Sequence, residues 1–277
     1  MKLSLSVRVA EKFHSKRQAN MSLADLADLA AANRYHALCM RASQLGTQTP
    51  LDTVRQKAGT LDAQALKVSM VTGDFPIPEN TDDEGPLALR NITPYLDLAE
   101  ALGADLLRIA MKTEEDIEWA QRATDEAAER HMRLAHQCHN ASLFEQVDRS
   151  LEVIGQVGRK NFGIIYEPAN LELCGEDYGP ETIKRLAPHT FNVYLQNQEL
   201  KEDGDSEINT WCRGSIRFDQ IPIWDGGGID FPAIMRTLEE IGYDGYVTIH
   251  QASAQLGTQV AVEESARYLR SLAHFDD

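Results

Sequence analysis

Polar side chains that can bind metals or small molecules stand near the carboxyl ends of the β-rich runs in this sequence, mainly in the second half of the chain. Imidazole, carboxylate and amide groups are ligands for Zn²⁺, Mn²⁺ or Co²⁺, and in a shared pocket they can also contact a substrate. If the runs lie in one sheet, their ends can converge on one site. The candidates are Gln137, His139, Glu167, Asn170, Tyr194, Gln196 and His250.

Side-chain alternation along a strand indicates which of these groups point the same way. Successive residues of a strand face opposite sides of the sheet, so Tyr194 and Gln196 share one face. Gln137 and His139 likewise share a face, and His136 should point away from it, toward the surrounding helices. We therefore interpret His136 as a structural residue.

Two arginines at the ends of separate strands, Arg41 and Arg108, are candidates for binding an anion. A guanidinium group can hold a phosphate or a carboxylate through two hydrogen bonds, and Lys112 could assist. The alternative is that these cations are solvated or paired with an acidic neighbour. The turn DGGG at 225–228 could hold phosphate before a helix. Because no GxGxxG pattern follows a strand there, it is better explained as a turn.

Eight β-rich runs, each followed by a helical stretch, must position these groups. This alternation predicts parallel strands joined by right-handed crossovers, and eight such units close a barrel. We predict one domain over residues 1–277, an α/β protein with a single (β/α)8 TIM barrel fold. The runs are LSLSVRV, HALCMR, LKVSMVT, ADLLRIAM, MRLAHQCH, FGIIYEP, FNVYLQN and GYVTIHQ.

Local signals place helix ends and loops between the runs. Ser22 can cap a helix that begins with LADLADLAA, and Gly103 and Gly242 can end two later helices. Two segments, at 73–86 and 198–228, are predicted as long loops after the third and seventh strands. In barrel enzymes that face carries the active site, so both loops could cover a small ligand.

Charge and composition exclude several classes of partner. The formal net charge of −16 repels polyanions, whereas nucleic-acid binding usually needs a clustered basic face. No apolar run is long enough to span a membrane, and the charged start lacks the character of a signal peptide, so we expect a cytoplasmic protein. The four cysteines lack CxxC spacing and are expected to be reduced thiols.

Several segments resemble the xylose isomerase-like sugar phosphate isomerase/epimerase family, which is related to metal-dependent apurinic-site endonucleases. GGGIDFPAIMRTLEEIGYDGYVTIH is similar to that family's glycine-rich turn, Asp-Phe-Pro helix start and Gly-Tyr-Asp-Gly-Tyr approach to the last strand. LAHQCHN, YEPANL and VYLQN resemble its fifth-, sixth- and seventh-strand motifs. The resemblance covers essentially the whole chain and implies a TIM barrel of the xylose isomerase type.

The positions that hold the metal in this family carry other residues here. Where the family has Glu, Asp, His and Glu, this sequence has Gln137, Glu167, Tyr194 and His250. The resemblance implies a divalent metal, Mn, Zn or Co, with Gln137, Glu167 and His250 as candidate ligands. One certain negative charge attracts a dication far less than three do, so a metal-free protein is the alternative. His136 or His139 could also join Glu167 and His250 in a displaced metal site.

The resemblance also implies a reaction type. In the family, two ligand carboxylates move a proton on and off a carbon beside a carbonyl. Gln137 cannot do this, so Glu167 and His250 are the candidate catalytic residues. Asn170 stands where the family often has a His or Asn that contacts the substrate. The candidate substrate contacts are Arg41, Arg108, His139, Asn170, Tyr194 and Gln196.

The function expected from this resemblance is an isomerase- or epimerase-like enzyme for a small sugar, sugar acid or sugar phosphate. A lyase acting on a keto-sugar is a close variant. The alternative from another class is a metal-free, catalytically altered barrel that binds sugar or regulates. A DNA-repair endonuclease would need more His and acidic ligands and a basic groove. The expected partner is therefore a small carbohydrate, not a nucleic acid or a membrane. Barrels of this group often pair, so a homodimer is also expected.

Overall fold

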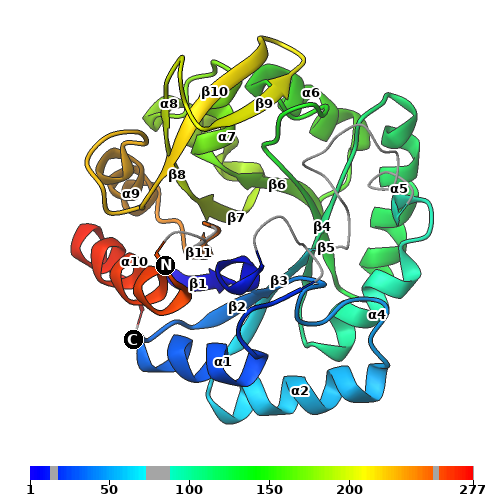
Figure 1. The fold of residues 1–277 in the computed structure, drawn as a ribbon. Helices are drawn as coiled ribbons and strands as arrows, with labels where there is room; N and C mark the ends of the chain where they lie inside the picture. Colours follow the sequence, from blue (N-terminus) through cyan, green and yellow to red (C-terminus); the bar gives the residue numbers. More distant parts are fainter. Residues whose placement is uncertain (13–17, 73–87, 252–255, 277) are drawn as a thin grey trace.

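Eight parallel strands form a closed barrel in the order β1-β11-β7-β6-β5-β4-β3-β2. The structure is a computed structural model that describes residues 1–12, 18–72, 88–251 and 256–276. Figure 1 looks down the barrel and shows helices surrounding the strands, with the two chain ends close together. This architecture confirms the predicted single (β/α)8 barrel.

Every β-rich run that the sequence predicted forms a barrel strand. Each strand pairs in parallel with its two neighbours, and β1 closes the barrel by pairing with β11. Strands buried on both faces read as short apolar runs, which is why the sequence showed them clearly. The strands are β1 (Lys2–Ser6), β2 (Ala37–Met40), β3 (Lys67–Thr72), β4 (Leu106–Ile109), β5 (Arg133–Gln137), β6 (Phe162–Tyr166), β7 (Thr190–Leu195) and β11 (Tyr246–Ile249).

The helices bury one apolar side against the barrel. Ser22 caps the first of them by accepting a hydrogen bond from the backbone of Asp25, as predicted, and Gly103 and Gly242 follow two helices with positive φ angles of 67° and 69°. The helices are α1 (Leu23–Ala32), α2 (Leu51–Ala63), α4 (Thr93–Ala101), α5 (Glu115–Glu129), α6 (Val147–Val157), α7 (Pro168–Leu173), α8 (Pro180–Leu186), α9 (Phe231–Glu240) and α10 (Thr258–Leu272), with short 3-10 turns η1 (Val7–Ala10) and η3 (Ala187–His189).

The segment predicted as a long loop after the seventh strand instead forms a small antiparallel sheet. It contains β8 (Asn197–Leu200), β9 (Ser206–Thr210) and β10 (Gly214–Ile221), in the order β8-β10-β9. Ile208 pairs with Ile216 across the hairpin, but most residues of β9 and β10 are polar, so these strands lack the regular apolar alternation that identifies a strand in a sequence. Figure 1 shows this sheet projecting beside the barrel mouth. The other predicted loop, at 73–86, lies outside the described residues.

The barrel interior is filled in layers. At the amino-terminal end, the hydroxyls of Ser4 and Ser69 lie 2.7 Å apart, and Thr248 donates to Asn192. A buried cluster above them includes Met70. This packing closes the barrel from below and leaves the polar residues at the strand carboxyl ends as the floor of its mouth. No helix within the described ranges is long and apolar enough to cross a bilayer.

Candidate active site

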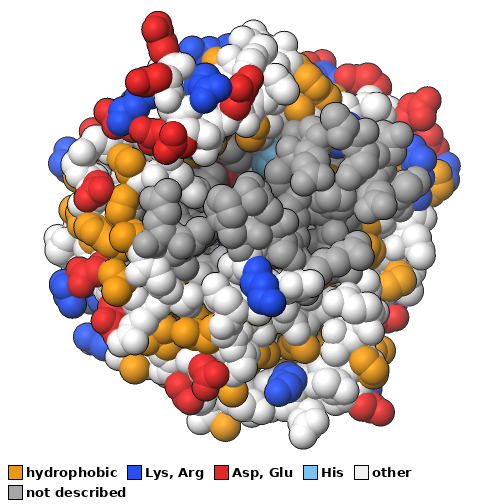
Figure 2. All heavy atoms as spheres, in the orientation of Figure 1, with side chains coloured by type: hydrophobic (Ala, Val, Ile, Leu, Met, Phe, Trp, Pro, Cys, Tyr) orange, Lys and Arg blue, Asp and Glu red, His pale blue; other side chains and the backbone are white. Residues whose placement is uncertain are grey.

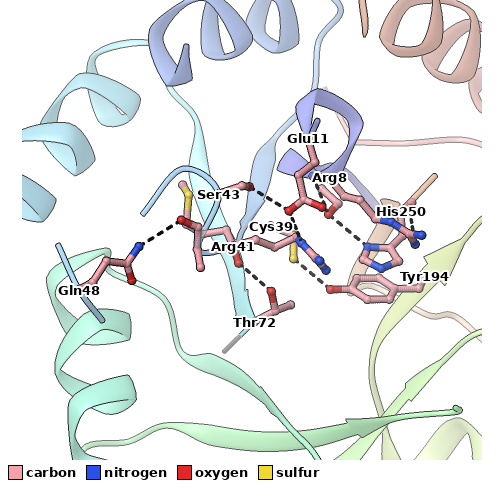
Figure 3. Close-up of polar contacts among 12 residues, drawn as sticks. Arg8, Glu11, Cys39, Arg41, Ser43, Gln48, Thr72, Tyr194 and His250 are labelled. Atoms are coloured by element: carbon pink, nitrogen blue, oxygen red, sulfur yellow. Dashed lines mark hydrogen bonds and ion pairs between the residues drawn. The ribbon is translucent and has the colours of Figure 1, made fainter. Parts of the chain in front are cut away.

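The lumen-facing residues at the carboxyl ends of the strands form one polar cluster. Five of them each lie two residues after a member of the buried cluster that includes Met70 and Tyr194, so side-chain alternation places them above that layer: Arg41, Arg108, Gln137, Glu167 and Gln196. Figure 3 shows one side of this cluster, with Arg8, Arg41, Tyr194 and His250 turned toward a common centre. Figure 2 shows a hollow in this face, with histidine and acidic surface visible at its floor.

Glu167 is a buried carboxylate held from one side only. It directly follows β6 and precedes α7, and its side chain is fully buried. Gln137 donates a hydrogen bond to its Oε2, and Asn170 Nδ2 donates to the same oxygen at 2.6 Å. Asn170 also donates to the Cys138 carbonyl at 2.8 Å, so its amide is fixed. The other oxygen of Glu167, Oε1, has no hydrogen-bond partner among the described residues.

Burial controls the protonation of Glu167. It raises the pKa of this carboxyl group to about 7, against the opposing effects of the Gln137 hydrogen bond and the charges of Arg108 and Arg8. Desolvation penalises the charged form more than these neighbours stabilise it. A carboxyl group with a pKa near neutrality can both accept and release a proton at cellular pH.

His250 lies flat against Tyr194. The two ring centroids are 4.0 Å apart and the planes differ by 6°. His250 Nδ1 lies 3.2 Å from the Ser6 hydroxyl, and the Tyr194 hydroxyl lies 3.1 Å from Cys39 Sγ. Burial, followed by the positive charges of Arg8, Arg41 and Arg108, holds the pKa of His250 well below its usual range. The imidazole is therefore neutral at pH 7.

Arg8 and Arg41 enter the mouth just beyond the carboxyl ends of the adjacent strands β1 and β2. Arg8, on η1, donates through one guanidinium nitrogen to Gln196 Oε1 and to the His250 carbonyl, each at 3.1 Å. Arg41 donates from Nε to Glu11 at 2.7 Å, and Ser43 donates to the same oxygen at 2.9 Å. Figure 3 shows these contacts converging on Glu11. The predicted alternative of an acidic partner thus applies to Arg41.

Arg108 differs from the other two arginines. It lies on β4, its residue is 5% exposed, and its Nε has no hydrogen-bond partner in the described part of the chain. Burial lowers its pKa to about 10, and the neighbouring Arg41 adds to the lowering. Arg108 is therefore neither solvated nor hydrogen-bonded to an acidic residue in the described part of the chain. It is a desolvated cation whose Nε–H is not used.

The structure brings most of the predicted site residues together. Seven of them contribute to the mouth through the contacts above: Arg41, Gln137, Glu167, Asn170, Tyr194, Gln196 and His250. Arg108 interacts electrostatically with Tyr194 and Glu167. His139 is buried near them, and its proximity also lowers the pKa of His250. Lys112 donates its backbone amide to Asp116 at the start of α5.

His136 points outward, as side-chain alternation predicted. Its ring stacks on Phe144 with centroids 4.1 Å apart, and Nδ1 lies 2.6 Å from the Gln137 carbonyl. It therefore does not join Glu167 in a displaced metal site. Arg8 was not among the predicted site residues, although Ser4, Ser6 and Arg8 share one parity that continues the lumen face of β1.

A second cluster lies outside the barrel mouth. Glu145, Cys174 and Cys212 place ligand atoms within 4.8 Å of one another. Glu145 accepts hydrogen bonds from the backbone amides of Ala141, Trp211 and Cys212. Its oxygens are thus engaged in fixing the β9–β10 turn against the barrel, which is a structural role. All four cysteines of the chain are free thiols, as expected.

A family model described as the xylose isomerase-like TIM barrel matches residues 28–272. The chain belongs to this family. The match includes β2 through β11 and therefore most of the barrel mouth. A comparison with curated protein sequences finds no significant match.

Solved structures of xylose isomerase-like barrels share this fold at low sequence identity. The probable 3-DHS dehydratase AsbF of Bacillus anthracis is 15% identical, with 98% of this chain and 99% of that chain covered and a TM-score of 0.73. A xylose isomerase domain protein from Planctomyces limnophilus is 18% identical, covers 98% and 95%, and has a TM-score of 0.73. A xylose isomerase-like barrel from Mycobacterium smegmatis, in complex with magnesium, is 15% identical, covers 98% and 96%, and has a TM-score of 0.68.

Two of the similar solved structures hold a divalent metal, one zinc and one magnesium. Of the four positions implied by the resemblance, only Glu167 is a carboxylate, and one of its oxygens already accepts two amide hydrogen bonds. Tyr194 keeps its proton, because burial raises its pKa well above the usual value. Three arginines surround the site in addition. In this arrangement the four positions do not fit a dication, whose desolvation must be offset by anionic ligands.

Proposed function

We propose that this protein is an isomerase- or epimerase-like enzyme that moves a proton on and off a carbon beside the carbonyl of a small carbohydrate, with Glu167 and His250 as its acid/base groups. One observation carries the proposal. A fully buried carboxylate with a pKa of about 7 stands in the mouth of a family barrel, with one oxygen free of hydrogen bonds among the described residues. Perturbed carboxyl groups in barrel mouths are typical of catalytic acids and bases.

The two groups have complementary properties. The amides of Gln137 and Asn170 fix one carboxylate oxygen of Glu167, and the other makes no hydrogen bond to a described residue. Glu167 can hold or release a proton at this oxygen near neutral pH. Neutral His250, stacked on Tyr194, can accept a proton or donate a hydrogen bond to a substrate oxygen. Both proton transfers, at Glu167 and at His250, use only these side chains.

Membership in the family supports the isomerase and epimerase reactions, and one specific finding keeps a lyase as the second candidate. The structure of a probable dehydratase shares the fold over almost its full length. Elimination of water from a keto-sugar begins with the same removal of a proton beside a carbonyl. The two reactions therefore require the same base and differ in the fate of the intermediate.

Exchange of carbon-bound protons with solvent tests the proposal whatever the final product is. The full chain is incubated in D₂O with small ketoses, aldoses, sugar acids, sugar phosphates and 2-keto acids, and exchange is followed by proton NMR. We expect deuterium beside the carbonyl of at least one of these compounds. Glu167→Gln should slow the exchange about 100-fold or more, the usual contribution of a general acid/base. A lyase would additionally form an unsaturated product.

Glu172→Gln is the matched control. Glu172 lies on the same helix, α7, but its carboxylate accepts a hydrogen bond from Gln198 at 3.4 Å rather than lying among the lumen residues described above. It should retain the wild-type exchange rate. Full exchange activity in Glu167→Gln would refute the assignment of Glu167. Sugar binding without exchange of any compound would favour the non-catalytic barrel.

A further inference from the structure

We propose that Arg8, Arg41 and Arg108 form a binding site for the anionic group of the substrate, a carboxylate or a phosphoryl group, and that this site works without a divalent metal. This inference deepens the proposed function. It rests on that function only where it calls the bound anion a substrate. The binding site itself stands on the contacts of the three arginines. It predicts a sugar acid, keto acid or sugar phosphate in place of a neutral sugar.

Arg108 provides the first argument, because it is a buried cation for which no hydrogen bond to a described residue is found. Its residue is 5% exposed, and its Nε makes no hydrogen bond to any described residue. A buried donor that lacks a partner costs free energy, and a buried charge costs more. Such a group persists where a ligand completes its hydrogen bonds, which is the reason that unpaired cations mark anion sites.

The charge balance of the mouth provides the second argument. Three guanidinium groups interact with two carboxylates of the described residues, those of Glu11 and Glu167. Counted over the described residues, the cluster therefore carries excess positive charge, although the overall net charge of the protein is −16. An anion of one or two charges would neutralise it.

The donors that remain free provide the third argument. The hydrogen bonds found for Arg8 use one terminal nitrogen, and the bond of Arg41 to Glu11 uses Nε. Glu11 and Ser43 on one side, and Gln196 on the other, thus orient two guanidinium groups, and the hydrogen bonds to described residues do not use all their N–H groups. Figure 3 shows both groups turned toward Tyr194 and His250. Fixed guanidinium groups with spare donors suit the several oxygens of a carboxylate or phosphate.

This arrangement also explains how the altered family positions remain compatible with proton transfer. Removal of a proton beside a carbonyl creates negative charge on oxygen, which a cation must stabilise. Guanidinium groups already desolvated in the mouth can supply that positive charge. Gln137 and Tyr194, which are neutral, are then consistent with a site that uses arginines in this role.

Calorimetric binding to the full chain in the presence of EDTA tests the inference. The probes are D-gluconate against neutral D-sorbitol, and D-glucose 6-phosphate against neutral D-glucose, so that each pair isolates one anionic group. We expect at least one anion to bind about tenfold or more tightly than its neutral counterpart. The pair with the larger ratio distinguishes a carboxylate from a phosphoryl substrate, and inorganic phosphate should compete.

Variants assign the effect to the arginines. Arg108→Met should weaken anion binding about tenfold or more, whereas Arg122→Met, on the outer surface of α5, should leave it unchanged. Because Arg108→Met removes a buried unpaired cation, its melting temperature should not fall, and Arg108→Lys checks any loss by restoring the charge. Arg8→Met should weaken the same ligand.

Three results would overturn the inference: equal affinity for anionic and neutral probes, unchanged affinity in Arg108→Met, or binding that disappears in EDTA. Failure of proton exchange with selective anion binding intact would remove the proposed reaction and leave this site standing. Proton exchange confined to neutral sugars would remove this anion site and leave the proposed reaction standing.

Discussion

The side-chain amide of Gln137 donates a hydrogen bond to Oε2 of Glu167 in the mouth of the barrel. The motif resemblance assigns these residues to two positions that hold a metal in the family. Here they bond to each other, and the donor is one that a carboxylate at position 137 could not supply when ionised. The contact orients Glu167 and stabilises its charged form, which lowers its pKa against the effect of burial.

Replacement of this donor should shift the titration of Glu167 upward. In Gln137→Leu the carboxylate loses a hydrogen bond to its charged form, so its pKa should rise above the present value of about 7. The pH dependence of proton exchange and carbon-13 NMR of labelled carboxyl groups both measure this change. Asn170→Leu should act in the same direction, because Asn170 donates to the same oxygen. An unchanged or lowered pKa would contradict this role of Gln137.

Restoration of the family ligands should create metal affinity. The double variant Gln137→Glu and Tyr194→His adds a carboxylate and an imidazole beside Glu167 and His250. Greater ligand charge offsets more of the desolvation of a dication, so Mn²⁺ or Zn²⁺ should bind the variant about tenfold or more tightly than the wild-type protein. Isothermal titration calorimetry measures the difference. Equally tight binding by the wild-type protein would show that its own ligand set suffices.

Acid should destabilise the fold through His136. Burial lowers the pKa of this histidine to about 3, whereas an unfolded chain has a histidine pKa near 6.5. The unfolded state therefore binds the proton first as pH falls, and stability should decrease from about pH 6.5 downward, by about 1.4 kcal/mol per pH unit for this group. Urea unfolding between pH 7 and 5 measures the slope. In His136→Phe, which retains an aromatic ring against Phe144, that contribution should be absent.

Two glycines should respond oppositely to the same substitution. A Cβ on Gly163, in β6, would meet the His189 carbonyl oxygen and come within 2.7 Å of the Phe191 ring. Gly163→Ala should therefore destabilise the protein by about 2 kcal/mol or more. Gly59, inside α2, has open space around the same position, so Gly59→Ala should stabilise by up to about 1 kcal/mol. Chemical denaturation compares them, and equal effects would contradict the packing described for β6.

The eight barrel strands could be predicted because their signal is local. Short apolar runs separated by helical stretches identified every barrel strand, and the alternation of side chains placed His136 outside the lumen. The β8–β10 sheet was not predicted, because its strands are polar and largely exposed. Its pairing depends on a hairpin and on Glu145, which anchors the turn from a distant part of the chain.

The sequence by itself determined the fold class and indicated many of the polar groups at the barrel mouth, though not Arg8, because strand pattern and side-chain alternation follow from backbone geometry over a few residues. Only the tertiary structure decided which of these groups meet. Cys39 and Tyr194 are 155 positions apart, and Arg8 and the His250 carbonyl 242. Barrel closure and the register between strands bring such pairs together. Burial in that closed mouth then sets the charge states of Glu167, His250 and Arg108, since desolvation depends on surroundings that no local pattern contains.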